Sequence, residues 1–416
     1  MDEYAKNVKE LVGSFGGLGK GSYRMEKERL WTPGFLGMGG SNLFLFMSQY
    51  IMVAALPIFI MDTLSGGDME AGMAMTAFQI GAVVCRPFAG RLIDAVDKQR
   101  LMCAATIGFF FVMLAFFWLH SMQAIFALRL LHGCIFAVAT TAAAAMAALI
   151  LPASRKGEGI GYFALSTNLA MVVGPLVGLL MIGHFGSQAL FLFVAGLGVA
   201  TAAAANFYRM PAAVRAPARR ERRGASLADF VEVRSLAPSL LGGLVFFAYG
   251  GILTFIPLYA KSLGMQAETS LFFLVFALVI ILTRPVIGRL FDVKGPDWTV
   301  YPGFAFFAAG MVWFSRAASL SGLLVSAAVL GVGFGALSPA FQTLAVQSAP
   351  PARAGVATAT YFWSLDISVG LAAMVLSVVA AHFGYAFMYG VAGTLIILAA
   401  AAGYFFWRRF SHRKRM

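Results

Sequence analysis

Apolar residues in this chain form runs of about 20 residues separated by short charged segments, and this is the length an α-helix needs to cross a bilayer. Six spans are predicted in the first half, at Phe35–Met61, Ala71–Cys85, Leu101–His120, Gln123–Leu151, Gly159–Ile182 and Ala189–Tyr208. Six more are predicted in the second half, at Ala237–Tyr259, Ser270–Thr283, Trp298–Phe314, Ser319–Leu344, Ala357–Ala381 and Tyr385–Trp407. The second and eighth helices should continue to about Leu92 and Leu290.

One segment of the chain occurs twice. Arg86 to Asp94 reads RPFAGRLID, and Arg284 to Asp292, 198 residues later, reads RPVIGRLFD. Solenoid repeats have periods of about 20 to 50 residues, so each copy here is expected to be a whole helical bundle. Both copies carry charges that belong at one membrane surface, so each bundle must hold an even number of spans. The sequence predicts an all-α membrane protein with twelve transmembrane helices in two parallel six-helix bundles.

Composition and charge agree with a membrane protein. Hydrophobic residues make up 60% of the chain and charged residues 12%, whereas soluble domains have about 45–50% apolar residues. The formal net charge of +13 comes from basic residues that lie, except for Lys261 and Arg316, in loops on one predicted face. Basic loops stay in the cytoplasm, so both termini are expected there. The positive charge therefore indicates orientation, and we exclude nucleic acid as a partner.

The same pattern divides the chain into five parts. These are a cytoplasmic N-terminal tail, the first bundle, a basic cytoplasmic linker, the second bundle and a basic tail, at residues 1–30, 31–208, 209–235, 236–407 and 408–416. The tail lacks the apolar core of a signal peptide; it is either solvated or a short amphipathic helix on the inner leaflet. Arginines of the linker suit contact with anionic membrane lipid.

Cofactors and metals are not expected. The glycine-rich segment Gly13–Ser22 lacks the spacing of a phosphate-binding loop, so energy must come from a gradient. Cys85, Cys103 and Cys134 have no metal-ligand spacing, and the 21 Met are scattered among the spans. No nucleophile, base and orienting group fall at one depth, which argues against an enzyme.

Motifs in the first bundle resemble those of the major facilitator superfamily, and the resemblance extends from about Trp31 to Trp407. The stretch from Gly90 to Arg100 resembles the family's G-x-L-x-D-R-x-G-R-R/K loop, although Ala95 and Asp97 stand where the family prefers Arg and Gly. Arg129-x-x-His132-Gly133 resembles its R-x-x-Q-G element. The resemblance implies a secondary transporter, which we expect to be a monomer in a bacterial cytoplasmic membrane.

The fifth span resembles the G-x8-G-x3-G-P-x2-G-G signature of proton-linked exporters. The matching residues are Gly161, Gly174, Pro175 and Gly178, and the second bundle has no copy of the Gly-Pro pair. This favours export of a small organic molecule by proton antiport. The alternatives are a proton- or sodium-coupled nutrient importer, and an exporter of metallophores or siderophores, which Leu30-Trp31-Thr32 and the repeated Arg-Pro-x-x-Gly-Arg segment also resemble.

The repeated loop is implied by the resemblance to latch the two halves together in the outward-open state. A carboxylate at a helix end can pair with nearby basic residues and cap the N-terminus of a neighbouring helix. We expect Asp94, with Arg91 or Lys98, to dock on the eleventh span; otherwise Asp94 and Asp292 merely end helices. The latch positions are Arg86, Gly90, Arg91, Asp94, Lys98, Arg284, Gly288 and Asp292.

Asp366 is the acidic residue deepest in a predicted span, about 15 Å from the inner surface. An intramembrane carboxyl group is costly, and its usual role is functional. It can exchange protons and compete with a cationic substrate, which is a minimal antiport mechanism; the alternative is a structural carboxyl group held by Ser364 or Tyr361. Its repeat partner is Asn168.

Arg129 is the buried cation of the fourth span. It could pair with Asp366, bind an anionic group of the substrate, or relay protons through His132, although its depth argues against direct pairing. Polar and aromatic residues at mid-depth are expected to line a substrate cavity; they are Asn168, Gln49, Tyr50, Tyr249, Gln342, Tyr361 and Trp363. A receptor or scaffold that transports nothing would tolerate the loss of the Asp366 carboxyl group.

Overall fold

The computed structural model describes residues 29–119, 121–217, 229–265 and 269–413, and within these ranges the chain forms helices and no strands. The long helices are α2 (Pro33–Leu64), α3 (Asp68–Ala95), α4 (Lys98–Ala115), α5 (Met122–Ile150), α6 (Lys156–Asn206), α8 (Val233–Ser262), α9 (Thr269–Lys294), α10 (Asp297–Ser315), α11 (Leu320–Gln347), α12 (Ala354–Phe387) and α13 (Thr394–Arg413). A short helix, α7 (Ala212–Arg215), precedes the second half. The predicted tail helix and the segment Gly13–Ser22 lie outside the described residues.

Several helices begin where the sequence offers a capping side chain. Thr32 accepts a hydrogen bond from Phe35 N at the start of α2, where Pro33 occupies the first turn. Asp97 and Ser121 cap α4 and α5 in the same way. Such residues satisfy backbone N–H groups that the first turn leaves unpaired. α3 and α9 continue past the predicted Leu92 and Leu290 to Ala95 and Lys294, so each contains the aspartate of its repeat copy.

α6 and α12 each reverse direction at a glycine. Gly186 has φ 79° and ψ 177°, and Gly384 has φ 81° and ψ 165°. This backbone region is essentially restricted to glycine. The predicted break between Ile182 and Ala189 is therefore a single tight reversal, and the repeat reproduces it 198 residues later. A short π-helical stretch, Met388–Gly393, joins α12 to α13.

The buried apolar side chains form two clusters. One is built almost entirely from residues between Leu30 and Val214, and the other from residues between Leu241 and Tyr404. Each cluster admits one residue of the other half, Val346 in the first and Met171 in the second. The two halves of the chain thus each bury their own apolar faces.

Apolar side chains also cover the outside of the helices, among them Phe111, Trp118 and Leu282, which are 60%, 61% and 66% exposed. Within the described residues, eight helical runs are long and apolar enough to cross a membrane: α2, Lys98–Trp118, α5, Ala153–Asn206, α8, α9, α11 and Pro351–Phe410. Lipid is the solvent that such a surface requires. The prediction of an all-helical, multi-pass membrane protein is confirmed.

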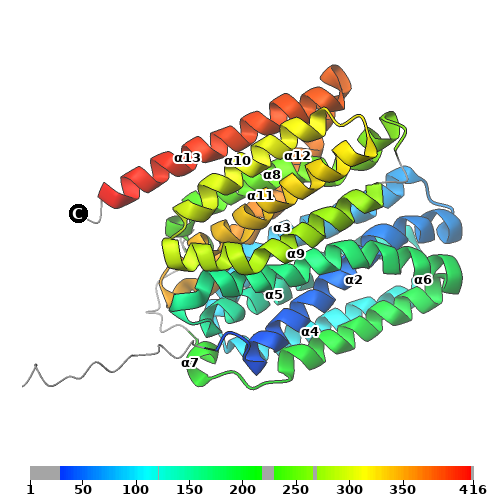
Figure 1. Cartoon of the computed structure of the whole chain (residues 1–416). Helices are drawn as coiled ribbons and strands as arrows, with labels where there is room; N and C mark the ends of the chain where they lie inside the picture. The colour runs from blue at the N-terminus through cyan, green and yellow to red at the C-terminus, as the bar shows by residue number, and fades with distance from the viewer. Residues whose placement is uncertain (1–28, 120, 218–228, 266–268, 414–416) are drawn as a thin grey trace, which may run out of the picture.

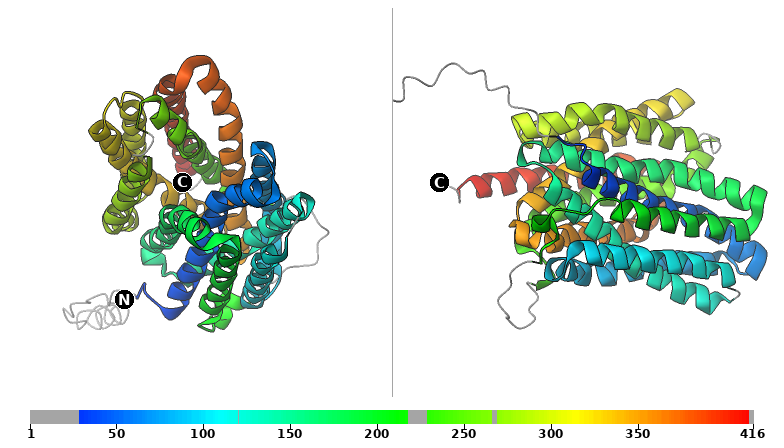
Figure 2. Two further views of the ribbon diagram at one scale, coloured as in Figure 1. Left: turned by 90° about the vertical axis from the view of Figure 1, so that its right-hand side faces the viewer. Right: turned by 90° about the horizontal axis from the view of Figure 1, so that it is seen from below.

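The long helices lie alongside one another, as Figures 1 and 2 show. α7 and the C-terminal end of α13 lie at one end of the bundle, and α6 and α12 reverse at the other. We call the first of these the α7 end.

Candidate functional site

An ion pair connects the two halves of the chain at mid-depth. Arg86 Nε of α3 lies 2.5 Å from Asp366 Oδ2 of α12, and the two side chains are only 3% and 19% exposed. Arg86 also donates to Thr140 Oγ1 at 3.0 Å and Thr141 Oγ1 at 3.2 Å, and its guanidinium lies over the Phe362 ring. The guanidinium is thus held on all sides, and it pairs with the carboxylate that the sequence singled out for coupling.

The partner of Asp366 differs from the cation considered first. Arg129 is completely buried and donates to Ala74 O at 3.2 Å and Gln49 Oε1 at 3.4 Å, and its guanidinium lies over the Phe78 ring. It also lies 3.0 Å from His132 Nδ1. Dipoles and an aromatic face therefore surround Arg129, and the direct pairing with Asp366, already doubtful on depth, is replaced by pairing with Arg86.

Three of the seven residues predicted to line a substrate cavity form hydrogen bonds with protein groups. Gln49 contacts Arg129; Tyr249 is buried against Met171, and Tyr361 donates to Ser338 O at 2.7 Å. Of the others, Gln342 is buried, and Asn168, Tyr50 and Trp363 are half-buried. The structure brings Tyr50 and Tyr249 towards the centre, since Tyr50 packs against the second apolar cluster.

At the α7 end, the first copy of the repeated loop docks on the start of α12. Asp94, which is 4% exposed, accepts hydrogen bonds from Gly355 N and Val356 N, both at 2.9 Å. Its two oxygens cap backbone N–H groups of the first turn, where the helix dipole favours negative charge. A charge-assisted hydrogen bond of this kind contributes about 1.5–3 kcal/mol.

The second copy makes the same contact in the opposite direction. Asp292 of α9 accepts from Gly157 N at 2.7 Å and Glu158 N at 2.8 Å, at the start of α6. The three residues of this contact are the repeat equivalents of Asp94, Gly355 and Val356, because each number differs by 198. We call these two contacts the Asp94 latch and the Asp292 latch.

Glycines let the helices of both latches approach each other. A Cβ atom on Gly90 would lie 2.5 Å from Ala359 Cβ, and one on Gly288 would lie 2.7 Å from Glu158 Cα. Larger residues at either position would separate the helices that the carboxylates join. The repeated Gly-Arg-Leu-x-Asp pattern thus combines a close helix crossing with a capping carboxylate.

Arg91 and Lys98, which we expected beside Asp94, form no ion pair with it among the described residues. The Arg91 guanidinium lies over the Phe230 ring, 4.9 Å from its centre, and Lys98 Nζ donates to Ala216 O at 2.8 Å. Both oxygens of Asp94 are already occupied by backbone donors. The direct partners of Asp94 are thus backbone N–H groups of α12, which contains the predicted eleventh span, and Lys98 acts on Asp94 only through its charge.

The Gly-Pro element of α6 packs against α2. A Cβ atom on Gly174 would lie 2.6 Å from Tyr50 Cβ, and one on Gly178 would lie 2.8 Å from Ile51 O. On another face of α6, a Cβ atom on Gly161 would lie 2.9 Å from Arg284 Cδ of α9. These glycines therefore set helix spacing in the middle of the molecule, while Pro175 removes a backbone donor there.

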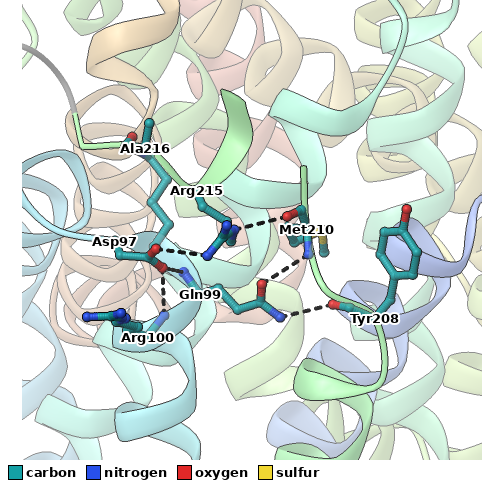
Figure 3. A network of polar contacts seen from close by, with 8 residues as sticks. Asp97, Gln99, Arg100, Tyr208, Met210, Arg215 and Ala216 are labelled. Carbon is teal, nitrogen blue, oxygen red and sulfur yellow. Dashed lines mark hydrogen bonds and ion pairs between the residues drawn. The ribbon is translucent and has the colours of Figure 1, made fainter. Parts of the chain in front are cut away.

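A polar network that the sequence did not reveal holds the segment after α6 against the start of α4 (Figure 3). We call residues 208–216 the strap. The Gln99 side chain donates to Tyr208 O and accepts from Met210 N, both at 3.0 Å. Asp97 pairs with Arg215 at 3.3 Å, and Lys98 binds the carbonyl of Ala216. The first part of the linker is therefore fastened to the first half of the chain.

Replacing Gln99 with Ala should loosen this strap. The change removes two hydrogen bonds to the strap backbone, a loss of about 1 kcal/mol that raises its opening about fivefold. Limited trypsin digestion in detergent should then cleave after Arg215 about fivefold faster than in the wild type. Replacing Arg100, whose side chain is exposed at the same helix end, with Gln should leave the rate unchanged; equal cleavage rates in both variants would contradict the role of Gln99.

Comparisons with known proteins identify similar chains. A family model described as the Major Facilitator Superfamily matches residues 38–373, and again residues 266–415. An uncharacterized MFS-type transporter of Burkholderia mallei is 28% identical over 368 residues, which cover 86% of this chain and 87% of that protein. One from Methanocaldococcus jannaschii is 22% identical over 359 residues, covering 85% and 92%. The crystal structure of the human organic anion transporter MFSD10 (TETRAN) superposes with a TM-score of 0.74 at 13% identity, covering 88% of this chain and 98% of that one.

Proposed function

Because the chain belongs to the Major Facilitator Superfamily, we propose that it is a twelve-helix proton antiporter that exports a small organic molecule by alternating access. It transports its substrate without covalent chemistry and without a cofactor. We place it as a monomer in a bacterial cytoplasmic membrane, with both termini and the basic linker in the cytoplasm. The α7 end is then the cytoplasmic end.

Twelve crossings are supported by the lengths of the helical runs. The runs Ala153–Asn206 and Pro351–Phe410 have 54 and 60 residues, or about 80–90 Å if straight, against a hydrocarbon core of about 30 Å. Each reverses at a glycine, so each crosses twice. Together with α3 and α10, the eight apolar runs then make twelve crossings. The separate apolar clusters, and the segregation of early and late helices in Figure 2, support two six-helix bundles.

The Arg86–Asp366 pair is the observation that carries the coupling proposal. It joins α3 to α12, the same two helices that the Asp94 latch joins at the cytoplasmic end. Protonation of Asp366 removes the charge that attracts Arg86, and so weakens the contact between the halves. Deprotonation restores it. A proton at Asp366 can therefore change the stability of the closed cytoplasmic end, which is what an antiporter requires.

The contacts between the halves support an outward-facing state. Among the described residues, the side-chain hydrogen bonds and ion pairs between the halves involve the two latches, the Arg86–Asp366 pair, Gln79 and Tyr249. They lie between the cytoplasmic end and mid-depth. The Gly174-Pro175 element, present in the first half alone, favours export over import.

Proteoliposomes offer a direct test of the coupling. A pool of small metabolites is added outside inside-acid vesicles that hold the protein with its cytoplasmic face outward, and uptake is measured by mass spectrometry. We expect at least one compound to accumulate about tenfold while protons leave, and to stop accumulating when the pH gradient is collapsed. Accumulation that follows an imposed sodium gradient instead, or ignores both gradients, would overturn proton antiport.

A further inference from the structure

The buried arginine of the repeat has different surroundings in the two copies. Arg284 of α9 is the copy of Arg86 and is 2% exposed. Three of the four groups that hold Arg86 have no equivalent in the second copy: Thr141 is replaced by Pro339, Phe362 by Ala164 and Asp366 by Asn168. The fourth, Thr140, corresponds to Ser338. Among the described residues, Arg284 has no carboxylate partner, and its Nη1 donates a hydrogen bond to Gly335 O at 2.9 Å.

Arg284 Nε has no hydrogen-bond partner in the part of the chain that the structure describes, and the same is true of Thr299 Oγ1. Both residues line one small cavity, together with Gly157 of α6 and Ala336 and Thr343 of α11. The volume of the cavity is ≈ 10 Å³, which is room for one small occupant.

Two positions in the lining of this cavity are polar only in the second copy. Thr299 and Thr343 stand where the first copy has Leu101 and Ala145. Thr343 already donates to Pro339 O at 2.7 Å, whereas the Thr299 hydroxyl has no acceptor. Thr299 also lies in the first turn of α10, at the end of the helix dipole that favours negative charge. The second copy thus carries two hydroxyl groups in the lining of its arginine cavity, at positions that are apolar in the first copy.

A buried guanidinium remains charged, because arginine is not deprotonated in proteins, and an uncompensated buried charge is strongly unfavourable. A water molecule would satisfy the two unpaired groups without compensating the charge. The neighbouring carboxylates are engaged, Asp292 with two backbone N–H groups and Glu158 with Arg155. Arg129 also has no carboxylate partner among the described residues, but three dipolar groups and the face of the Phe78 ring surround its guanidinium, whereas Arg284 has a single carbonyl.

We propose that the cavity between Arg284 and Thr299 binds a single halide-sized anion, which in the cell is chloride. The anion accepts hydrogen bonds from Arg284 Nε and the Thr299 hydroxyl, and supplies the negative charge that Asp366 supplies to Arg86. Gly157 belongs to the first half of the chain, lines the cavity and also donates its N–H to Asp292. When the Asp292 latch opens, Gly157 moves away from the second half, and the cavity loses one wall. Chloride therefore stabilises the state in which this end is closed. This proposal is independent of substrate, direction and coupling ion.

The test is thermal unfolding of the purified full-length protein in detergent, with sodium chloride exchanged for sodium gluconate at constant ionic strength. Chloride at about ten times its dissociation constant should raise the unfolding midpoint by about 2 °C, and the rise should grow with the logarithm of concentration. Broadening of the ³⁵Cl NMR line by the protein, reversed by bromide, should report the same site. Equal midpoints in both salts, or no reversible broadening, would mean that the cavity holds water only.

Variants assign the effect to this cavity. Arg284→Gln and Thr299→Val should both lose the chloride-dependent rise, whereas Arg289→Gln, on the exposed face of the same helix, should keep it. Thr299→Val removes an unpaired hydroxyl group at nearly constant volume, so in gluconate it should unfold no earlier than the wild type. It therefore tests the site even if Arg284→Gln fails to fold. A wild-type chloride response in Thr299→Val would overturn the proposal.

Spin labels give a second readout in a variant whose three native Cys are replaced by Ala. Ala153→Cys and Val293→Cys place labels at exposed positions on either side of the Asp292 latch. Pulsed electron paramagnetic resonance should show that chloride increases the short-distance population in the wild type and not in Thr299→Val. An unchanged distribution in the wild type would contradict the link between the anion and the closed end.

Discussion

Proton-driven accumulation will disappear when Asp366 is replaced by Asn, and the protein will lose stability at the same time. The substitution removes the proton-binding group and leaves the Arg86 guanidinium buried without its carboxylate. Breaking a buried pair on one side costs about 3–5 kcal/mol. We expect at least a tenfold fall in gradient-driven accumulation in proteoliposomes, together with a lower unfolding midpoint in detergent.

Removal of both charges separates the effect on proton coupling from the effect on stability. The double variant Arg86→Gln, Asp366→Asn leaves neither charge unpaired, so it should regain most of the midpoint lost by either single variant, but none of the gradient-driven accumulation. Asp366→Glu retains a carboxyl group and should keep part of the accumulation. Accumulation by the stable double variant at the wild-type level would show that the pair is structural.

The cytoplasmic end should open when the latch carboxylates are neutralised. An Asn at position 94 keeps one acceptor and loses the charge, so one of the two N–H groups of α12 loses its partner. The loss of about 2 kcal/mol raises the ratio of open to closed molecules roughly thirtyfold. Pulsed electron paramagnetic resonance between labels at Ala95→Cys and Ala352→Cys, both exposed, should show a new long distance. Asp292→Asn should do the same for labels at Ala153→Cys and Val293→Cys.

Asp97→Asn is the matched control for both latches. Asp97 lies three residues after Asp94 and also caps a helix, but its three partners belong to the first half of the chain and the strap. Its neutralisation should therefore leave both distance distributions unchanged. If Asp97→Asn opens the end as far as Asp94→Asn does, the latch carboxylates have no special role.

The membrane character and helical class could be predicted because apolar runs report burial in lipid directly. Helix ends were predicted to within a few residues where a capping side chain such as Thr32 or Ser121 follows a charged or polar segment. The repeat predicted that Asp94 and Asp292 occupy equivalent positions in the two halves of the chain. Asp366 was singled out because an acidic residue stands out in an apolar span.

The ion-pair partner of Asp366 could not be predicted from the sequence. Arg86 was grouped with the latch because it lies in the repeated segment, although a helix places it about 12 Å from Asp94. Which of two buried arginines meets Asp366 depends on the rotation of α3 and α5 about their axes, and no sequence pattern reports it. The strap was missed for a related reason: Gln99 and Lys98 bind backbone carbonyls, which have no residue-specific signature.

In each latch the acceptor is a side chain and the donors are backbone N–H groups. Mutations on the two sides of a latch should therefore have unequal effects. Every substitution of Asp94 or Asp292 except Glu removes at least one of the two carboxylate acceptors, whereas a side-chain exchange in α12 or α6 leaves the N–H donor in place. Only proline deletes such a donor, and only bulk at Gly355 or Gly157, where a Cβ atom would lie 2.6 Å from Asp94 Oδ1 or 2.8 Å from Asp292 Oδ1, displaces it. In a random-mutagenesis screen, alleles that open this end should therefore concentrate in α3 and α9. The receiving helices should tolerate most changes at Glu158, and exchanges among small apolar residues at the buried Val356.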